Sequence, residues 1–308
     1  MLKSTQINSA PGLQTTIQQL GSYRLIRLLR CGGYATLYLG EHRYLKTQVV
    51  LKLLNTWYAT ESDVRSLLSE ARLHACFPHT HIVRVLDFGK AEDIPFMVID
   101  YAPHGTLHEH FPQQRVVTLQ VILPYVLQVG LALQYLHDAD IVHGDVKPQN
   151  ILLGPNFEAW LCDFGAARSV TQSLHLGDEQ IPRGTVLYAA PEQIRGRPEP
   201  ASDQYALGVM LYTWLCGHYP FQGSATQICH QHLYAEPKGM RAFMPEIPDA
   251  IEQVILRSLA KEPSRRFSCI ATFMDALQQA TCCPAFRHRT PLMYVRSLLT
   301  KLLSRENS

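Results

Sequence analysis

The most informative part of the sequence is His143-Gly144-Asp145-Val146-Lys147-Pro148-Gln149-Asn150, because two further motifs follow it along the chain. These are Asp163-Phe164-Gly165 and Ala190-Pro191-Glu192. Each motif alone is short enough to occur by chance, but their order and spacing on one chain make coincidence improbable. The segments 140–165 and 166–200 that carry them are rich in Gly, Pro, Asp and Asn, which indicates loops.

The chain before these loops is rich in short strands. From Tyr23 to about residue 100, five apolar or β-branched runs predict strands: YRLIRLLR, YATLYLGE, QVVLKLL, HIVRVLDFG and PFMVIDY. One helix is expected from about Thr60, since Thr60 and Asp63 form a capping-box pattern ahead of apolar residues at helical spacing. These features predict a small β-rich lobe.

The chain after Gly105 is predominantly helical. Helical periodicity marks 121–137, 249–260 and 268–280, and the segment 204–216 is apolar nearly all round, which predicts a central buried helix. Pro124 and Gln128 interrupt the longest apolar run, so we expect a buried helix there and not a membrane span.

Composition narrows the class of protein. The chain has 308 residues, about twice the usual domain length, so two lobes or two domains are expected. Its formal charge of +2 argues against nucleic-acid binding, and 46% hydrophobic residues argue against disorder. The first residues lack the apolar run of a signal peptide, and the eight cysteines contain no CxxC pair, so a cytoplasmic location is expected.

Over about residues 23–280 the three motifs resemble those of the eukaryotic-type protein kinases, particularly the Ser/Thr kinases of bacteria. The resemblance implies an α+β, bilobal protein-kinase fold, with a small β-rich N-lobe that has one main helix and a larger helical C-lobe. The implied organisation is a flexible leader (1–20), a kinase domain (21–283) and a basic amphipathic tail (284–308). Within the domain, the N-lobe covers 21–100, the hinge 100–103 and the C-lobe 104–283.

The resemblance also assigns roles to the charged residues of the motifs. Asp145 would accept the proton of the substrate hydroxyl, and Lys147 would contact the γ-phosphate of ATP. Asp163 and Asn150 would hold Mg²⁺ or Mn²⁺.

Further upstream, Lys52 ends a VVLK strand that is similar to the VAIK motif, so it would contact the α- and β-phosphates. Glu70, on the helix that follows, is its expected partner. A surface ion pair is the plainer interpretation of these two residues.

The nucleotide pocket follows from the same resemblance, although each of its apolar residues would equally suit an ordinary core. It would be formed by Leu29, Gly32, Gly33, Leu37, Val50, Lys52, Ile99, Asp100, Ala102 and Leu152. The glycine-rich loop departs from the family pattern GxGxxG, because Arg30 and Ala35 replace its outer glycines. We expect ATP to bind despite this departure.

A second departure is Gly144, where the family usually has an Arg that pairs with a phosphate on the activation segment. We therefore expect a non-RD kinase whose basal activity does not require phosphorylation of that segment. Ser169, Thr171 and Ser173 are candidate autophosphorylation sites. Thr185, Glu192, Asp203 and Arg266 match architectural positions, and Glu192 should pair with Arg266.

The sequence thus predicts a protein serine/threonine kinase that uses ATP and Mg²⁺ or Mn²⁺ and acts on protein substrates. A pseudokinase that binds nucleotide or serves as a scaffold is the main alternative, and a kinase of small molecules is a third. Apolar residues at 292, 295, 299 and 302 with interspersed Arg and Lys predict an amphipathic basic tail helix. It would be either packed on the C-lobe or a docking element, and membrane contact is expected only through residues 285–308. The sequence leaves the oligomeric state open.

Overall fold

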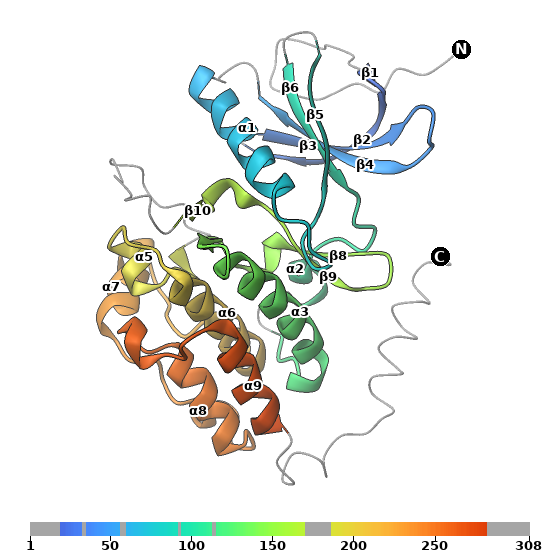
Figure 1. Cartoon of the computed structure of the whole chain (residues 1–308). Helices are drawn as coiled ribbons and strands as arrows, with labels where there is room; N and C mark the ends of the chain where they lie inside the picture. Colours follow the sequence, from blue (N-terminus) through green and yellow to red (C-terminus); the bar gives the residue numbers. More distant parts are fainter. Residues whose placement is uncertain are drawn as a thin grey trace. The chain divides into compact units, whose positions relative to one another are not determined.

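The computed structural model describes residues 19–32, 35–55, 60–91, 94–112, 115–169 and 186–281. These residues form two compact units (Figure 1). The first unit contains the chain up to Gly105 together with Leu152–Gly165, and the second contains Thr106–Ile151 and the chain from Ala166 onward.

The first unit is built on a six-stranded antiparallel sheet with the strand order β1-β2-β3-β4-β6-β5. Its strands are β1 (Gln19–Leu20), β2 (Tyr23–Cys31), β3 (Ala35–His42), β4 (Gln48–Leu54), β5 (Val85–Ala91) and β6 (Ile94–Asp100). The five strands expected from the sequence are all present. The added strand β1 corrects the predicted leader 1–20, because Leu20 is only 1% exposed and packs in the core with Tyr23 and Phe96. Most residues next to Leu20 are polar or glycine, so the sequence alone does not predict that Leu20 is buried.

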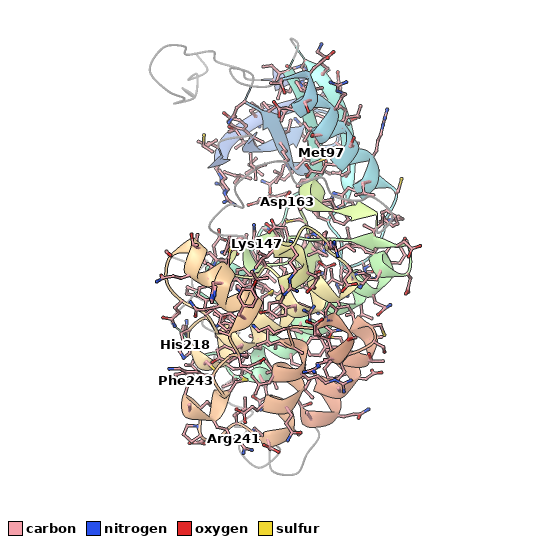
Figure 2. All side chains as sticks on the ribbon, turned by 90° about the vertical axis from the view of Figure 1, so that its left-hand side faces the viewer. Met97, Lys147, Asp163, His218, Arg241 and Phe243 are labelled. Carbon is pink, nitrogen blue, oxygen red and sulfur yellow. The ribbon has the colours of Figure 1, made fainter. Side chains whose placement is uncertain are left out.

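Both faces of the sheet are covered by apolar contacts. One face buries Leu51 and Val98 in a cluster with the aromatic residues of β2, β3 and β6. On the other face, Leu54 and Met97 pack against Leu67 and Ala71 of helix α1 (Glu61–Ala75) (Figure 2). The predicted capping box is present, since Asp63 N–H donates to the Thr60 hydroxyl and the Asp63 carboxylate accepts from Thr60 N–H.

A later hairpin also belongs to the first unit. It consists of β8 (Ile151–Leu153) and β9 (Ala159–Leu161). Backbone hydrogen bonds explain its placement, because Val83 N–H donates to the Leu161 carbonyl at 3.0 Å and His104 N–H donates to the Leu153 carbonyl at 3.3 Å. The sequence assigns the whole of 104–283 to the C-lobe. By their contacts, residues 104–105 and 152–165 group with the sheet.

The second unit is helical and is organised around α6 (Pro200–Cys216), in which every residue from Ser202 to Cys216 is buried. The other helices are α2 (Leu107–His110), α3 (Leu119–His137), α5 (Pro191–Ile194), α7 (Ala225–Tyr234), α8 (Asp249–Ser258) and α9 (Ile270–Thr281). Short strands β7 (Ile141–Val142) and β10 (Arg168–Ser169) pair antiparallel. By length and apolar composition α3 could cross a membrane. In this fold it contacts α6 and α9 and buries Val126, Val129 and Leu133.

Candidate active site

The first unit presents Lys52 from the middle of β4. Lys52 Nζ donates to both carboxylate oxygens of Glu70, at 2.7 and 2.9 Å. Glu70 lies on the buried face of α1 beside Leu67 and Ala71, so its carboxylate is held inside the unit. The predicted Lys52–Glu70 partnership is therefore present, and it is a largely buried pair, with 15% of the Lys52 side chain exposed.

Asp163 extends this pair into a three-residue cluster. Its Oδ1 lies 3.7 Å from Lys52 Nζ, and 47% of its side chain is exposed. Its φ of +68° is left-handed, which is uncommon for a residue other than glycine. Burial alone would lower the pKa of Lys52, but the charges of Glu70 and Asp163 outweigh it and raise that pKa. The two carboxylates therefore favour the charged form of Lys52.

The glycine-rich turn is closed by polar contacts that the sequence did not reveal. Gly32 N–H donates to the Ala35 carbonyl at 3.0 Å, and the side chain of Asn55 donates to the Gly32 carbonyl at 2.7 Å. Thr36 Oγ1 in turn donates to Asn55 Oδ1 at 2.6 Å. A Cβ at position 32 would come within 3.0 Å of the Ala35 carbonyl, so the turn favours the glycine retained there. Gly33 lies outside the described residues.

Strand register places several predicted nucleotide residues on one face of the sheet. Leu37 pairs with Lys52, and Val50 pairs with Ile99, so these side chains share the face of β4 that carries Lys52. Leu29 lies at a register shift between Leu28 and Arg30, which is a β-bulge.

The remaining predicted nucleotide residues lie at the end of β6, just after it, or on the later hairpin. The Asp100 carboxylate is held by Arg84 at 2.7 and 3.0 Å, Ala102 is buried in the following segment, and Leu152 is half-buried on β8.

The second unit gathers the other charged residues around Asp145. Lys147 Nζ donates to Asp145 Oδ2 at 2.6 Å, and Asn150 Nδ2 donates to the same oxygen at 2.9 Å. Asn150 Nδ2 also donates to the Asp145 backbone carbonyl at 2.9 Å, which fixes the loop. The structure thus brings Asp145, Lys147 and Asn150 together at the catalytic-loop position that the sequence predicts.

Asp203, on helix α6, holds the backbone of this loop. Its carboxylate accepts from the backbone N–H groups of His143 and Gly144, both at 2.9 Å. It also contacts His137 Nε2 at 2.8 Å, a partner that the sequence analysis missed. Burial would raise the pKa of Asp203, but the hydrogen bond and charge of His137, the charge of His143 and the Gly144 N–H lower it below its ordinary value.

The segment after the undescribed residues 170–185 is fixed by Glu192. Arg266 donates to both of its carboxylate oxygens, at 2.7 and 2.8 Å, as the sequence predicts. Ser202 Oγ donates to Glu192 Oε1 at 2.7 Å, and the Arg266 guanidinium also donates to the Ala201 and Ala260 carbonyls. Thr171, Ser173 and Thr185 lie outside the described residues, and Ser169 is described only as part of β10.

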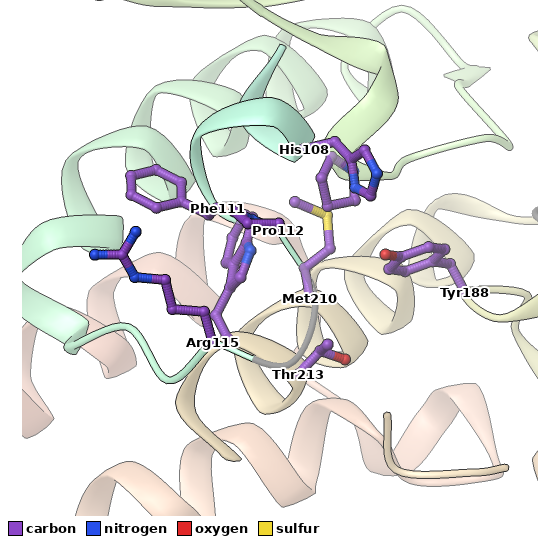
Figure 3. A pocket seen from close by; sticks show the side chains of 9 residues that line it. His108, Phe111, Pro112, Arg115, Tyr188, Met210 and Thr213 are labelled. Carbon is purple, nitrogen blue, oxygen red and sulfur yellow. The ribbon is translucent and has the colours of Figure 1, made fainter. Parts of the chain in front are cut away.

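A small hollow, partly open to solvent, lies beside the loop of residues 143–150 within the second unit. Figure 3 shows its side chains, with Phe111 and Arg115 at one side and Tyr188 at the other. Its lining consists of His108, Phe111, Pro112, Arg115, Pro148, Tyr188, Met210, Thr213 and Trp214. Pro148 and Tyr188 therefore place the catalytic loop and the segment before Glu192 around the same hollow.

Each unit offers one oxygen ligand of the kind that a hard divalent cation takes. Asp163 offers an exposed carboxylate, and the amide nitrogen of Asn150 is engaged by Asp145, so oxygen is the atom that Asn150 can offer. Carboxylate and amide oxygens are the ligands that Mg²⁺ uses in proteins.

Comparisons with known proteins agree with this geometry. Residues 23–280 match the protein kinase domain. The chain is 33% identical over 250 residues to the serine/threonine-protein kinase PrkC of Bacillus subtilis, which covers 80% of this chain and 38% of PrkC. It is 31% identical over 285 residues to PknL of Mycobacterium tuberculosis, covering 88% of this chain and 71% of PknL. The DNA damage-responsive serine/threonine-protein kinase RqkA of Deinococcus radiodurans is 35% identical over 251 residues, covering 80% of this chain and 37% of RqkA.

The chain therefore spans less than half of PrkC and of RqkA, and the shared part in each case is about the length of the matched domain. The match covers most of the chain, and it includes every motif with which the sequence analysis began. This protein belongs to the protein kinase family.

Proposed function

We propose that the protein is a serine/threonine kinase that transfers the γ-phosphate of ATP to hydroxyl groups of protein substrates. The observation that carries the proposal is the Asp145 carboxylate, held by Lys147 and Asn150 on one loop. An acceptor carboxylate beside a fixed cation is what phosphoryl transfer to a hydroxyl asks of the protein, because positioning and electrostatics dominate this reaction.

The chemistry assigns a proton acceptor and two cations. The substrate hydroxyl oxygen forms a bond to the γ-phosphorus while the bond from that phosphorus to the β–γ bridging oxygen breaks. The hydroxyl proton passes to Asp145, and ADP leaves. Lys147 offsets negative charge on the transferred group, and Lys52, oriented by Glu70, binds the phosphates that remain on the nucleotide.

A divalent cation completes the set, because it neutralises charge on the phosphates when it is bound. Asp163 and Asn150 are the residues that would hold it. The exposure of the Asp163 carboxylate supports this role.

Several features support protein substrates and transfer to Ser or Thr. Lys147 is the residue that resembles Ser/Thr kinases at this position, and the buried Glu192–Arg266 pair fixes the segment that corresponds to peptide docking. The curated relatives are named serine/threonine-protein kinases. Gly144 supports a non-RD enzyme, and autophosphorylation on Ser169, Thr171 or Ser173 is part of the same proposal.

Transfer from radiolabelled ATP tests the proposal. The protein is incubated with Mg²⁺ or Mn²⁺, alone and with a generic basic protein substrate, beside an Asp163→Ala sample. Label that is recovered as phosphoserine or phosphothreonine and is absent from the variant supports the kinase.

The exposed Arg30 in the glycine-rich turn favours one alternative, a pseudokinase that binds nucleotide without transfer. Its signature would be an increase in melting temperature with MgATP in folded protein that gives no labelled product with either metal. That result would overturn the proposed activity.

A further inference from the structure

The residue before Asp145 has an unusual backbone. Gly144 has a φ of +77°, and a Cβ at this position would lie 3.1 Å from the Ala166 carbonyl oxygen. Glycine suits this conformation, but it supplies no side chain to fix the loop. Besides the contacts that Lys147 and Asn150 make with Asp145 itself, the partners of the Gly144 backbone thus help to set the path of the loop.

Both polar groups of the Gly144 backbone have side-chain partners. Its N–H donates to Asp203 Oδ1 at 2.9 Å, and its carbonyl accepts from Gln193 Nε2 at 2.5 Å. The first contact comes from the buried helix α6. The second comes from α5, the short helix that also carries Glu192. The peptide unit that leads into Asp145 is consequently held by Gln193.

Gln193 uses both ends of its amide. While Nε2 donates to the Gly144 carbonyl, Oε1 accepts from Ala190 N–H at 3.4 Å. A glutamate lacks the donor when ionised, and a lysine lacks the acceptor. The amide therefore links the Ala190-Pro191-Glu192 motif to the catalytic loop in a way that few other side chains permit.

The anchor of this link is itself rigid. Arg266 and Ser202 fix the Glu192 carboxylate, so the residue next to Gln193 is tied to the buried part of the unit. A small hollow with room for about one water molecule lies between the linked segments, and both Gln193 and Asp145 line it. Gly144 lines the same hollow, so without the hydrogen bond from Gln193 its carbonyl would face this space with no side-chain partner.

We propose that Gln193 is a positioning residue for phosphoryl transfer, which acts through the Gly144 carbonyl to fix the orientation of Asp145. The inference rests on the proposed kinase function. In this proposal an uncharged side chain orders the catalytic loop without any modification. It acts at a position where Gly144 has no side chain of its own.

Two substitutions test the role. Gln193→Glu keeps the shape but loses the donor while it is ionised, and Gln193→Met keeps the length and loses both polar groups. Gln279→Glu and Gln279→Met, on the exposed side of α9, are matched controls. We expect kcat to fall about 10- to 100-fold in both Gln193 variants, with KM for MgATP within about twofold of the wild type. The controls should match the wild type.

The pH profile separates positioning from general destabilisation. A protonated glutamic acid regains a hydrogen-bond donor, so the kcat of Gln193→Glu relative to wild type should recover as pH falls toward its pKa, which is about 4.3 in water and higher when buried. Gln193→Met should show no such recovery. If Gln193→Glu does not fold, Gln193→Met still tests the role, because a positioning residue should lower kcat and leave KM for MgATP nearly unchanged.

Hydrogen exchange distinguishes failure of this inference from failure of the kinase proposal. Amides of 143–150 should exchange faster in Gln193→Met than in wild type, while the amides of α6 keep their protection. Unchanged exchange in 143–150, or a wild-type kcat in both folded variants, overturns the positioning role. An inactive wild type whose loop exchange still responds to Gln193→Met overturns the kinase proposal and leaves the structural link in place.

Discussion

Arg266 and Glu192 form a bidentate ion pair in which the Arg266 side chain has no exposed surface. The guanidinium also donates to three backbone carbonyls and lies over the ring of Tyr205 at 4.8 Å. All N–H donors of the Arg266 side chain are thus satisfied in a buried site. Removing one partner of such a pair leaves the charge of the other uncompensated. The pair joins the end of the activation segment to the interior of the second unit.

The substitution Arg266→Met should lower the free energy of unfolding by about 3–5 kcal/mol, because it strands the Glu192 carboxylate. Urea denaturation measures this change. Arg265→Met, at the exposed neighbouring position, is the matched control and should change the stability by less than about 0.5 kcal/mol. Equal losses in the two variants would contradict the account of the pair.

The Lys52–Glu70 pair predicts a different outcome, in which activity changes more than stability. Lys52→Met should reduce kcat/KM about 10²- to 10³-fold, since it removes a fixed cation from the phosphates. Its stability loss should stay at about 1–3 kcal/mol, because the Lys52 side chain keeps some solvent contact. Lys46→Met, at a largely exposed lysine in the turn between β3 and β4, should retain activity. A Lys52→Met protein with wild-type turnover would refute the assigned role.

His232 makes the second unit sensitive to acid. Burial, followed by the charge of Lys261, lowers the pKa of His232 to about 3. Its Nδ1 contacts the Tyr205 hydroxyl at 2.8 Å. The unfolded chain therefore binds the proton more readily than the native chain below about pH 6.5, so stability falls with falling pH. The loss should approach about 1.4 kcal/mol per pH unit until the folded pKa is reached.

The measurement compares the wild type with His232→Gln, which keeps a polar side chain and does not titrate. As pH falls from about 6.5 to 4, the free energy of unfolding should fall more in the wild type than in His232→Gln. The lowered pKa of Asp203 acts in the same direction in both proteins and cancels in the difference. A difference that stays constant over this range would show that His232 does not carry the acid sensitivity.

The glycine at position 144 predicts that kinase activity does not depend on phosphorylation of the activation segment. No cation stands at this position to pair with a phosphate, so a protein with Ala at positions 169, 171 and 173 should keep transfer to an exogenous substrate within about threefold of wild type. Circular dichroism checks that the triple variant is folded. Loss of transfer in folded protein would mean that one of these hydroxyls is needed.

The sequence predicted those parts of the fold that follow from periodicity and from short motifs. Strands β2 to β6, the capped helix α1 and the buried helix α6 were expected, as were Lys52–Glu70 and Glu192–Arg266. Periodicity could not reveal that Leu20 begins the sheet, because a strand of two residues is too short to show an alternating pattern. It also could not reveal that 152–165 belongs with the sheet, since backbone hydrogen bonds across distant segments decide this.

The missed site residues have a common physical cause. Asn55, His137 and Gln193 each act through a hydrogen bond to a partner far along the chain. Such contacts depend on side-chain orientation, which residue spacing does not encode. For Gln193 a local signal existed, because a glutamine three residues after Ala190 and directly after a proline and a glutamate is typical of the first turn of a helix.

The role of Asp145 as proton acceptor is the central claim, and its direct test is the rate of phosphate transfer by Asp145→Asn. This change keeps the size of the side chain and removes its charge. Asp140→Asn is the matched control, because Asp140 is exposed and its φ of +58° suits asparagine. The account predicts at least a 10²-fold loss of transfer in Asp145→Asn and wild-type transfer in Asp140→Asn. Undiminished transfer by folded Asp145→Asn would contradict it.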